Sequence, residues 1–150
     1  MRIEAAGIAG LDSAVAVMER AFDARFGEAW SASQVRGVLV MPGADLLIAT
    51  DDRPLGFALV RTVVGEAELM LLGVDPDRRR EGLGRSLLQA VADAARSRDA
   101  RRLFLEVRED NSAINFYERA GFRQVGRRRN YYKGRDGRLR DAVTYAVSLV

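Results

Sequence analysis

A turn rich in arginine and glycine has residue types that bind phosphate groups. It consists of Arg79, Arg80, Glu81, Gly82, Leu83 and Gly84, and it lies between an apolar run over 69–74 and a predicted helix. The start of a helix presents free backbone N–H groups and the positive end of the helix dipole. Glycines let an anion approach the backbone, and guanidinium groups suit phosphate. The turn therefore predicts a phosphate-binding loop, with a solvated basic turn as the alternative.

The spacing of this turn differs from two well-known phosphate-binding motifs. No Gly-Lys-Ser/Thr triplet follows it, so it is not the loop of the nucleoside triphosphatases. It also lacks the third glycine of the dinucleotide fingerprint. The turn by itself therefore leaves both readings open.

Composition excludes several kinds of chemistry. The 150 residues contain no cysteine and no histidine, which excludes thiolate nucleophiles, Ser-His-Asp triads and most zinc sites. Acid–base chemistry must then come from Asp, Glu, Tyr, Lys or water. The length and the 48% hydrophobic content suit a single domain over 1–150.

Charge is unevenly distributed along the chain. Residues 1–75 carry 6 basic and 11 acidic side chains, whereas residues 76–150 carry 18 basic and 10 acidic ones. The basic half suits a phosphate-rich ligand; we do not expect nucleic acid, because no aromatic platform accompanies the arginines. No apolar run is long enough to span a membrane and no signal peptide is recognisable, so we expect a cytoplasmic protein.

Hydrophobic periodicity and turn residues predict the elements that position these residues. Strands are expected over Arg2–Ala5, 46–50, 55–64, 66–74, 103–107, from 122 past 132, and over 141–149. Helices are expected over 13–25 with Asp12 as cap, from a capping box at Ser31 and Gln34 to 42, from 83 to about 98, and from 111 or 112 to 121. This order predicts a mixed α/β sheet with helices on both faces and parallel neighbouring strands in the βαβ unit 66–107.

With these elements in place, the chain resembles the GNAT acetyltransferases over nearly its whole length. The turn over 79–84 is similar to the Arg/Gln-x-x-Gly-x-Gly/Ala signature with which that family holds the pyrophosphate of acetyl-CoA. Further similarity lies in the segments 66–69, 73–76, 105–108, 116–122, 130–132 and 141–142, and at Asn111. Within the family the chain is similar to the RimI branch, which acetylates the N-terminal alanine of a small-subunit ribosomal protein.

The resemblance implies a fold and an activity. The fold is a mixed, mostly antiparallel sheet with a central, splayed pair of parallel strands and helices on both faces. The activity is transfer of acetyl from acetyl-CoA to the N-terminal α-amine of a protein by direct attack in a ternary complex, without a metal. A small-molecule amine or a lysine side chain as acceptor, and a non-catalytic CoA-binding module, remain as alternatives.

The resemblance also implies which residues bind acetyl-CoA. Strand groups at Leu72, Gly73 and Val74 would bind its pantetheine arm. Around the pyrophosphate it implies Arg79, Arg80, Gly82, Leu83, Gly84 and Arg85, and it adds Asn111 to the same site.

Two residues are implied as catalytic. Glu106 would be the general base, and strand alternation puts it on the same face as Phe104, where partial burial would raise its pKa. Tyr117 would protonate the CoA sulfur. The residues alone leave alternatives open: Glu106 could pair with Arg108 or another arginine, and Tyr117 could be a core tyrosine.

The implied partner is a peptide or protein N-terminus, and the oligomeric state is left open. Candidates for its binding site are Trp30, Glu68, Tyr131 and Tyr132. Glu68 is a reserve base or an exposed strand charge. The two adjacent tyrosines are expected on opposite faces of their strand, so that at most one contacts substrate. The arginines at 127–129 are expected to form a solvated face.

One departure from the family pattern concerns the connection between the two catalytic candidates. Glu106 and Tyr117 are eleven positions apart, one fewer than is usual in the family. We therefore expect a tightened start of the intervening helix. Whether Asp110 or Asn111 fills the family's asparagine position stays open.

Overall fold

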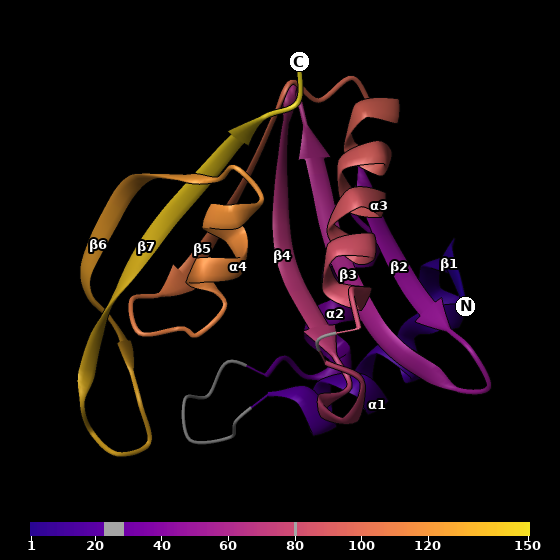
Figure 1. The fold of residues 1–150 in the computed structure, drawn as a ribbon, viewed down its shortest axis with the longest axis horizontal. Coiled ribbons are helices and arrows are strands. Elements are labelled where there is room, and N and C mark those ends of the chain that lie inside the picture. The colour runs from indigo at the N-terminus through magenta and orange to yellow at the C-terminus, as the bar shows by residue number, and fades with distance from the viewer. Residues whose placement is uncertain (23–28, 80) are drawn as a thin grey trace.

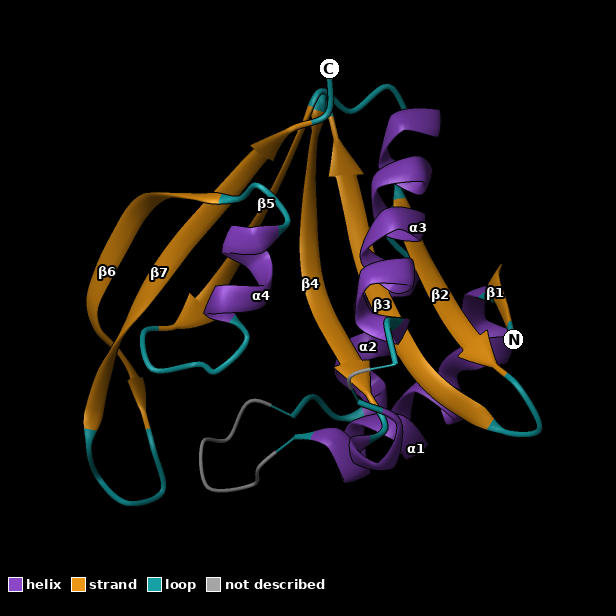
Figure 2. Ribbon diagram, viewed as in Figure 1, coloured by secondary structure: helices purple, strands orange, loops and turns teal. Residues whose placement is uncertain are grey.

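The computed structural model describes residues 1–22, 29–79 and 81–150, which form a seven-stranded sheet with helices on both faces (Figure 1). The strands are β1 Arg2–Ala5, β2 Ala44–Thr50, β3 Pro54–Val63, β4 Glu66–Val74, β5 Arg102–Arg108, β6 Arg123–Lys133 and β7 Leu139–Ser148. The helices are α1 Leu11–Ala21, α2 Ala32–Leu39, α3 Leu83–Ser97 and α4 Ile114–Arg119, with 3₁₀ turns η1 Gly7–Gly10 and η3 Pro76–Arg78 (Figure 2). The expected order of strands and helices is confirmed.

The sheet has the order β1-β2-β3-β4-β5-β7-β6. Its described pairs are antiparallel except for β4 and β5, which are parallel. Helix α3 connects these two strands across one face of the sheet, as expected for a βαβ unit. The expected mixed sheet is therefore confirmed.

The two early helices begin in different ways. The predicted capping box opens α2: the Ser31 N–H donates to Gln34 Oε1 at 2.7 Å, and the Gln34 N–H donates to Ser31 Oγ at 3.2 Å. Helix α1 instead continues directly from η1 with Gly10 at its N-cap, so the prediction that Asp12 caps it is wrong. Asp12 lies in the first turn, because the preceding 3₁₀ turn already supplies the entry to the helix. The helix ends at Ala21 because the backbone of Phe22 is extended, so the expected continuation toward residue 25 is wrong at Phe22, and residues 23–25 lie outside the described residues.

Two hydrophobic layers hold the sheet between its helices. One layer joins α3 and α4 to the sheet and includes Leu87, Val91 and Leu105. The other joins α1 and α2 to the opposite face and includes Met18 and Phe57. Burial of these apolar side chains stabilises the fold and fixes which face of each strand carries the polar groups.

Strand β4 carries a bulge that changes the direction of its side chains. Leu71 pairs with Leu59 but Leu69 pairs with Val60, so Met70 is an extra residue in this strand. Beyond the bulge Leu72 packs on the α3 side. Gly73 faces Phe57 so closely that a Cβ there would lie 2.6 Å from Phe57 Cε1. A larger residue at Gly73 would therefore require Phe57 to move.

The parallel strands β4 and β5 pair at one end and then separate. Their register is Glu66 with Arg102, Ala67 with Leu103, and Glu68 with Phe104. After that point β4 stays with β3 and β5 stays with β7. Figure 1 shows the two strands diverging toward the end of the sheet where α3 begins. The expected splayed pair is confirmed.

Candidate active site

Glu106 lies at the point where β4 and β5 separate. It is two residues beyond Phe104, the last residue of β5 that pairs with β4. Its neighbours Leu103 and Leu105 are buried in the α3 and α4 layer, so alternation directs Glu106 to the other face. The side chain is 18% exposed. The predicted strand alternation thus places a largely buried carboxylate beside the opening.

The carboxylate of Glu106 pairs with an arginine from another strand. Arg128 Nε lies 3.0 Å from Glu106 Oε2 and comes from β6, across the intervening β7. The alternative that Glu106 pairs with an arginine is therefore observed with Arg128. Arg108 pairs with Asp110. All three arginines at 127–129 are exposed, as expected for a solvated face, and Arg127 and Arg128 are also ion-paired, with Asp141 and Glu106.

A second carboxylate, Glu68, lies near Glu106 on the adjacent strand. Burial raises its pKa, and the negative charge of Glu106 raises it further, while Arg128 and Arg61 lower it to a smaller extent. The net effect is a raised pKa. Glu68 is therefore half-buried and electrostatically coupled to Glu106, and the alternative of an exposed strand charge does not hold.

Tyr131 and Tyr132 lie together rather than on opposite faces. Their ring centroids are 5.2 Å apart in an edge-to-face arrangement, so the expectation from simple alternation is wrong. The register of β6 shifts between Arg128 and Tyr132, and Asn130 has a left-handed φ of 54°. The Asn130 N–H donates to Asp141 Oδ1 at 2.8 Å, which holds this irregularity.

Both tyrosines lie near the ion pair of Glu106 and Arg128. The Arg128 guanidinium that pairs with Glu106 lies 4.8 Å from the centroid of the Tyr131 ring. The pKa of Tyr132 is raised by burial and by the nearby charge of Glu106. Glu68, Glu106, Arg128, Tyr131 and Tyr132 thus form one cluster, which we call the carboxylate–tyrosine cluster.

Tyr117 lies in the hydrophobic layer of α3 and α4, on the other face of the sheet from Glu106. Its side chain is 6% exposed and packs edge-to-face against Phe116 and Phe122, with ring centroids 5.2 and 5.6 Å away. Burial raises the pKa of its phenol, which keeps the proton on the oxygen. The ring of Tyr117 is therefore buried in the core, as the alternative of a core tyrosine predicts. The raised pKa also keeps the hydroxyl protonated, so that it can donate a proton.

The connection from Glu106 to Tyr117 includes a turn at Asn111, and α4 begins at Ile114 rather than at residue 111 or 112 as predicted. The Asn111 N–H donates to Arg108 O, and Asn111 Oδ1 accepts from the Ala113 N–H at 2.8 Å. Asp110 is instead bound by Arg108 and Arg140. Of the two candidates, Asn111 therefore shapes the turn into α4, and Asp110 holds two arginines.

The glycine turn begins helix α3 with an open backbone. Gly82 is the N-cap, with a left-handed φ of 80° and no atom within 4 Å of the position of a Cβ. A Cβ on Gly84 would lie 3.5 Å from Phe116 Cζ, so the first turn of α3 lies beside α4. Gly82 has no side chain with which to cap this helix end, so the first N–H groups of α3 fit an anion such as a pyrophosphate.

The other residues predicted for this turn are arranged differently. Leu83 is buried in the core, so only its backbone is available to a ligand. Arg79 Nη2 donates to Ala21 O at 2.9 Å at the end of α1. Arg85 is exposed in the first turn of α3, and Arg80 lies outside the described residues.

Asp75 anchors the approach to this turn, and the sequence analysis did not identify it. Its carboxylate is 1% exposed and accepts from Arg53, from Arg20 at 3.1 Å and from the Asp77 N–H at 3.0 Å. The Arg53 hydrogen bond, with the Asp77 N–H, lowers its pKa to about 2. The Asp75-Pro76 pair is a capping signal that could have indicated this role.

Trp30 is not part of the carboxylate–tyrosine cluster in the interactions observed. It is half-buried in the α1 and α2 layer, and its backbone N–H donates to Met18 Sδ with an N···S distance of 3.1 Å. It precedes the Ser31 cap of α2. Its role in binding a substrate stays a prediction.

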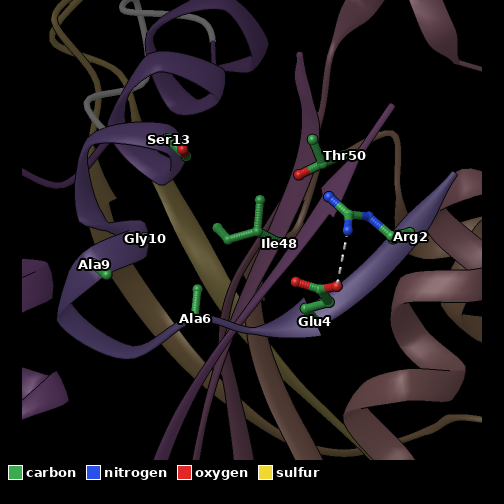
Figure 3. Close-up of a pocket in the computed structure, with 8 residues that line it drawn as sticks. All are labelled: Arg2, Glu4, Ala6, Ala9, Gly10, Ser13, Ile48 and Thr50. Carbon is green, nitrogen blue, oxygen red and sulfur yellow. Dashed lines mark ion pairs between the residues drawn. The ribbon is translucent and has the colours of Figure 1, made fainter. Parts of the chain in front are cut away.

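A pocket at the other edge of the sheet is separate from this site. It lies between β1, η1 and α1, where Arg2 and Glu4 form an ion pair of 3.6 Å (Figure 3). None of the predicted site residues lines it. Within the described parts of the chain, no cluster of three or more possible metal-ligating side chains occurs, and no helix is long and apolar enough to cross a membrane.

Comparison with known proteins identifies the chain's relatives. The model of the acetyltransferase (GNAT) family matches residues 14–122. The chain is 42% identical over 106 residues to the [ribosomal protein bS18]-alanine N-acetyltransferase of Salmonella typhimurium, covering 70% of this chain and 71% of the relative.

Solved structures show the same fold. The ribosomal-protein-S18-alanine N-acetyltransferase of Escherichia coli superposes with a TM-score of 0.86 and 32% identity, covering 99% of this chain and 93% of that one. An aminoglycoside 6'-N-acetyltransferase complexed with coenzyme A superposes with a TM-score of 0.78 over 100% and 98% of the two chains, at 19% identity. Members of this fold therefore bind coenzyme A.

Proposed function

Because this chain belongs to the GNAT family of acetyltransferases, we propose that it transfers acetyl from acetyl-CoA to the N-terminal α-amine of a protein. The acceptor we propose is the N-terminal alanine of a small-subunit ribosomal protein. The carrying observation is 42% identity to a relative named for that reaction. A ribosomal acceptor would be met in the cytoplasm, where we propose the enzyme acts.

The residues that would hold acetyl-CoA lie between β4 and the start of α3. The open N–H groups behind Gly82 and Gly84 fit its pyrophosphate, and the backbone of residues 72–74 fits its pantetheine arm. Acetyl-CoA supplies the activated acetyl group. Arg79 and Arg85 would add positive charge to the same end, with Arg79 releasing its bond to Ala21.

Glu106 would take up the proton that the acceptor ammonium must lose. An α-ammonium has a pKa of about 7.7–8.0, well below that of lysine at about 10.4, so a carboxylate acting directly or through one water suffices. Glu68 lies close enough to share the positive charge. The described arrangement of two carboxylates at the opening supports this role.

Tyr117 would donate its phenolic proton to the CoA sulfur as the thiol leaves. Burial keeps this proton on Oη at any working pH, since it raises the pKa of the phenol. Its position on the α3 and α4 side, opposite to Glu106, supports separate roles for the two groups. Direct transfer is favoured because the chain has no cysteine that could carry an acyl group.

Tyr131 and Tyr132 would bind the peptide backbone. Their rings lie together beside Glu106, and Tyr131 is 53% exposed. Two hydroxyl groups at the site of the terminal amine suit the carbonyl and N–H groups of the first peptide units. This arrangement favours a peptide over a small amine.

The test is thiol release from acetyl-CoA with a short peptide that begins with alanine, compared with the same peptide blocked at its N-terminus. We expect turnover with the free peptide alone. A second blocked peptide that contains a lysine tests the lysine alternative. Turnover with this peptide would show acetylation of the lysine side chain. Turnover with small polyamines and none with the free peptide would contradict the proposal.

A further inference from the structure

An ion pair occupies the carboxylate that the proposed reaction needs. Arg128 Nε lies 3.0 Å from Glu106 Oε2, and the Arg128 side chain is 61% exposed. The carboxylate itself is largely buried, at 18% exposure of the side chain, and the guanidinium occupies one of its oxygen atoms. An acceptor ammonium that approaches Glu106 from solvent therefore competes with Arg128 for the same oxygen atoms.

The surroundings of Arg128 allow its side chain to leave this position. It lies at the start of the irregular part of β6, where the register with β7 shifts. Its guanidinium rests against the ring of Tyr131, which is itself exposed. Because the Arg128 side chain is 61% exposed, water can solvate the guanidinium when it leaves the carboxylate. Its departure is favourable once another cation takes its place on Glu106.

The charges around Glu106 require a cation there. Glu68 and Glu106 come from adjacent strands and repel each other, and Arg128 is a cation paired with Glu106. A peptide N-terminus carries one positive charge, as does the guanidinium. An exchange of one for the other keeps the charge of the cluster constant and avoids an unpaired, largely buried carboxylate.

We propose that Arg128 holds the place of the substrate's terminal ammonium group on Glu106, and that the peptide N-terminus displaces the guanidinium when it binds. The inference rests on the proposed function, because it takes the α-amine as the acceptor. Arg128 is then a competitor of the substrate that keeps the base paired in the empty enzyme. Its removal strengthens binding of the ammonium instead of weakening it.

The test measures peptide binding to the enzyme–CoA complex by calorimetry, for Arg128→Gln and for the wild type. We expect Kd and KM of the free peptide to fall about two- to fivefold, the factor that an exposed ion pair supplies. Binding of the N-terminally acetylated peptide, which has no ammonium, stays unchanged. Thermal unfolding checks that the variant is folded.

Two variants serve as controls. Arg129→Gln removes the adjacent exposed arginine, and we expect it to leave both peptides unaffected. Arg128→Lys retains a cation that can pair with Glu106, and we expect free-peptide binding close to that of the wild type.

Three outcomes would overturn the exchange while leaving the proposed function intact. Weaker binding of the free peptide by Arg128→Gln would make Arg128 a substrate-binding residue. An equal change for free and acetylated peptides would make it structural, and no change for either would show that the pair does not compete. Absence of wild-type turnover on every free peptide would instead overturn the proposed function, and the exchange with it.

Discussion

Gly84 in α3 and Phe116 in α4 lie against each other so closely that a Cβ on the glycine would be 3.5 Å from the ring's Cζ. This contact joins the helix start proposed to bind pyrophosphate to the helix that carries Tyr117. The distance is an ordinary van der Waals contact, so alanine fits at Gly84 without a clash. Affinity for acetyl-CoA and stability can therefore be separated at this position.

Gly84→Ala is expected to leave acetyl-CoA binding intact and to stabilise the protein. The family signature accepts alanine as well as glycine at this position, the added methyl group meets the Phe116 ring at an ordinary contact distance, and alanine favours the helix by up to about 1 kcal/mol. We expect an unchanged KM for acetyl-CoA, measured by thiol release, and an unchanged or raised Tm. Gly37→Ala in α2 is the control for the helix effect, because its Cβ meets open space in another helix. A lower Tm in Gly84→Ala would contradict the contact with Phe116.

Gly82→Ala, in contrast to Gly84→Ala, is expected to reduce the stability of the protein. Gly82 has a φ of 80°, which costs a residue with a Cβ about 1–2 kcal/mol. Thermal unfolding of this variant should therefore show a lower Tm than that of Gly84→Ala. Equal Tm values would contradict the left-handed conformation of this N-cap.

Glu106→Gln is expected to lower kcat by about 10²–10⁴-fold, the range for loss of a general base. The amide keeps the shape of the side chain but accepts no proton at working pH. Steady-state rates on a free peptide provide the measurement. Glu109→Gln is the control and should retain most of the activity. Glu109 directly follows β5, the strand that carries Glu106, and its carboxylate pairs with Arg127. A similar loss in both variants would point to a structural effect.

Tyr117→Phe is expected to lower kcat by about 10²-fold or more, since the ring packing stays while the proton donor is lost. Because burial raises the pKa of Tyr117, its titration lies above the usual tyrosine range. If the wild-type rate declines at alkaline pH below pH 10, the variant should therefore show the same decline with the same midpoint pH.

Tyr145→Phe is the matched control for this variant. Tyr145 is a second tyrosine buried in the same layer, on β7. It should lose no activity, with thermal unfolding used to compare the two proteins. Equal activity of Tyr117→Phe and Tyr145→Phe would exclude Tyr117 as the acid.

Asp75→Asn is expected to lose stability in a pH-dependent way. The folded protein holds the pKa of Asp75 at about 2, against about 3.9 in an unfolded chain. The carboxylate therefore stabilises the fold above about pH 4, and this contribution is lost as the pH falls toward 2. The stability difference between wild type and variant should be largest near neutral pH and should shrink over that window, measured by urea unfolding. Asp12→Asn at an exposed site should show no such trend.

Thr62→Val is expected to stabilise the protein by about 1 kcal/mol, because it removes a buried hydroxyl that lacks a partner. Thr62 Oγ1 is the fully buried side-chain oxygen or nitrogen that makes no hydrogen bond within the described residues. Valine keeps the β-branched shape in β3. Thr50→Val, at a half-buried strand end, should change stability by less, and a lower Tm for Thr62→Val would contradict this account.

Local patterns in the sequence predicted much of the architecture. The capping box of α2 and the strand β4 depend on neighbouring residues and were confirmed. The alternation of β5 also placed Glu106 on the correct face. Such features are determined by spacing along the chain, because period and capping act within a few residues.

Contacts between distant segments depended on the tertiary structure. The pairing of Glu106 with Arg128 requires β7 to lie between their strands, and the ring contact of Tyr131 with Tyr132 requires the irregularity in β6 that Asp141 holds. Asp75 likewise gained its partners from α1 and from the turn before β3. The sequence by itself determined which residues could form a site and on which elements they lie; strand order and local bulges decided which charges meet, because these interactions join residues far apart in the chain.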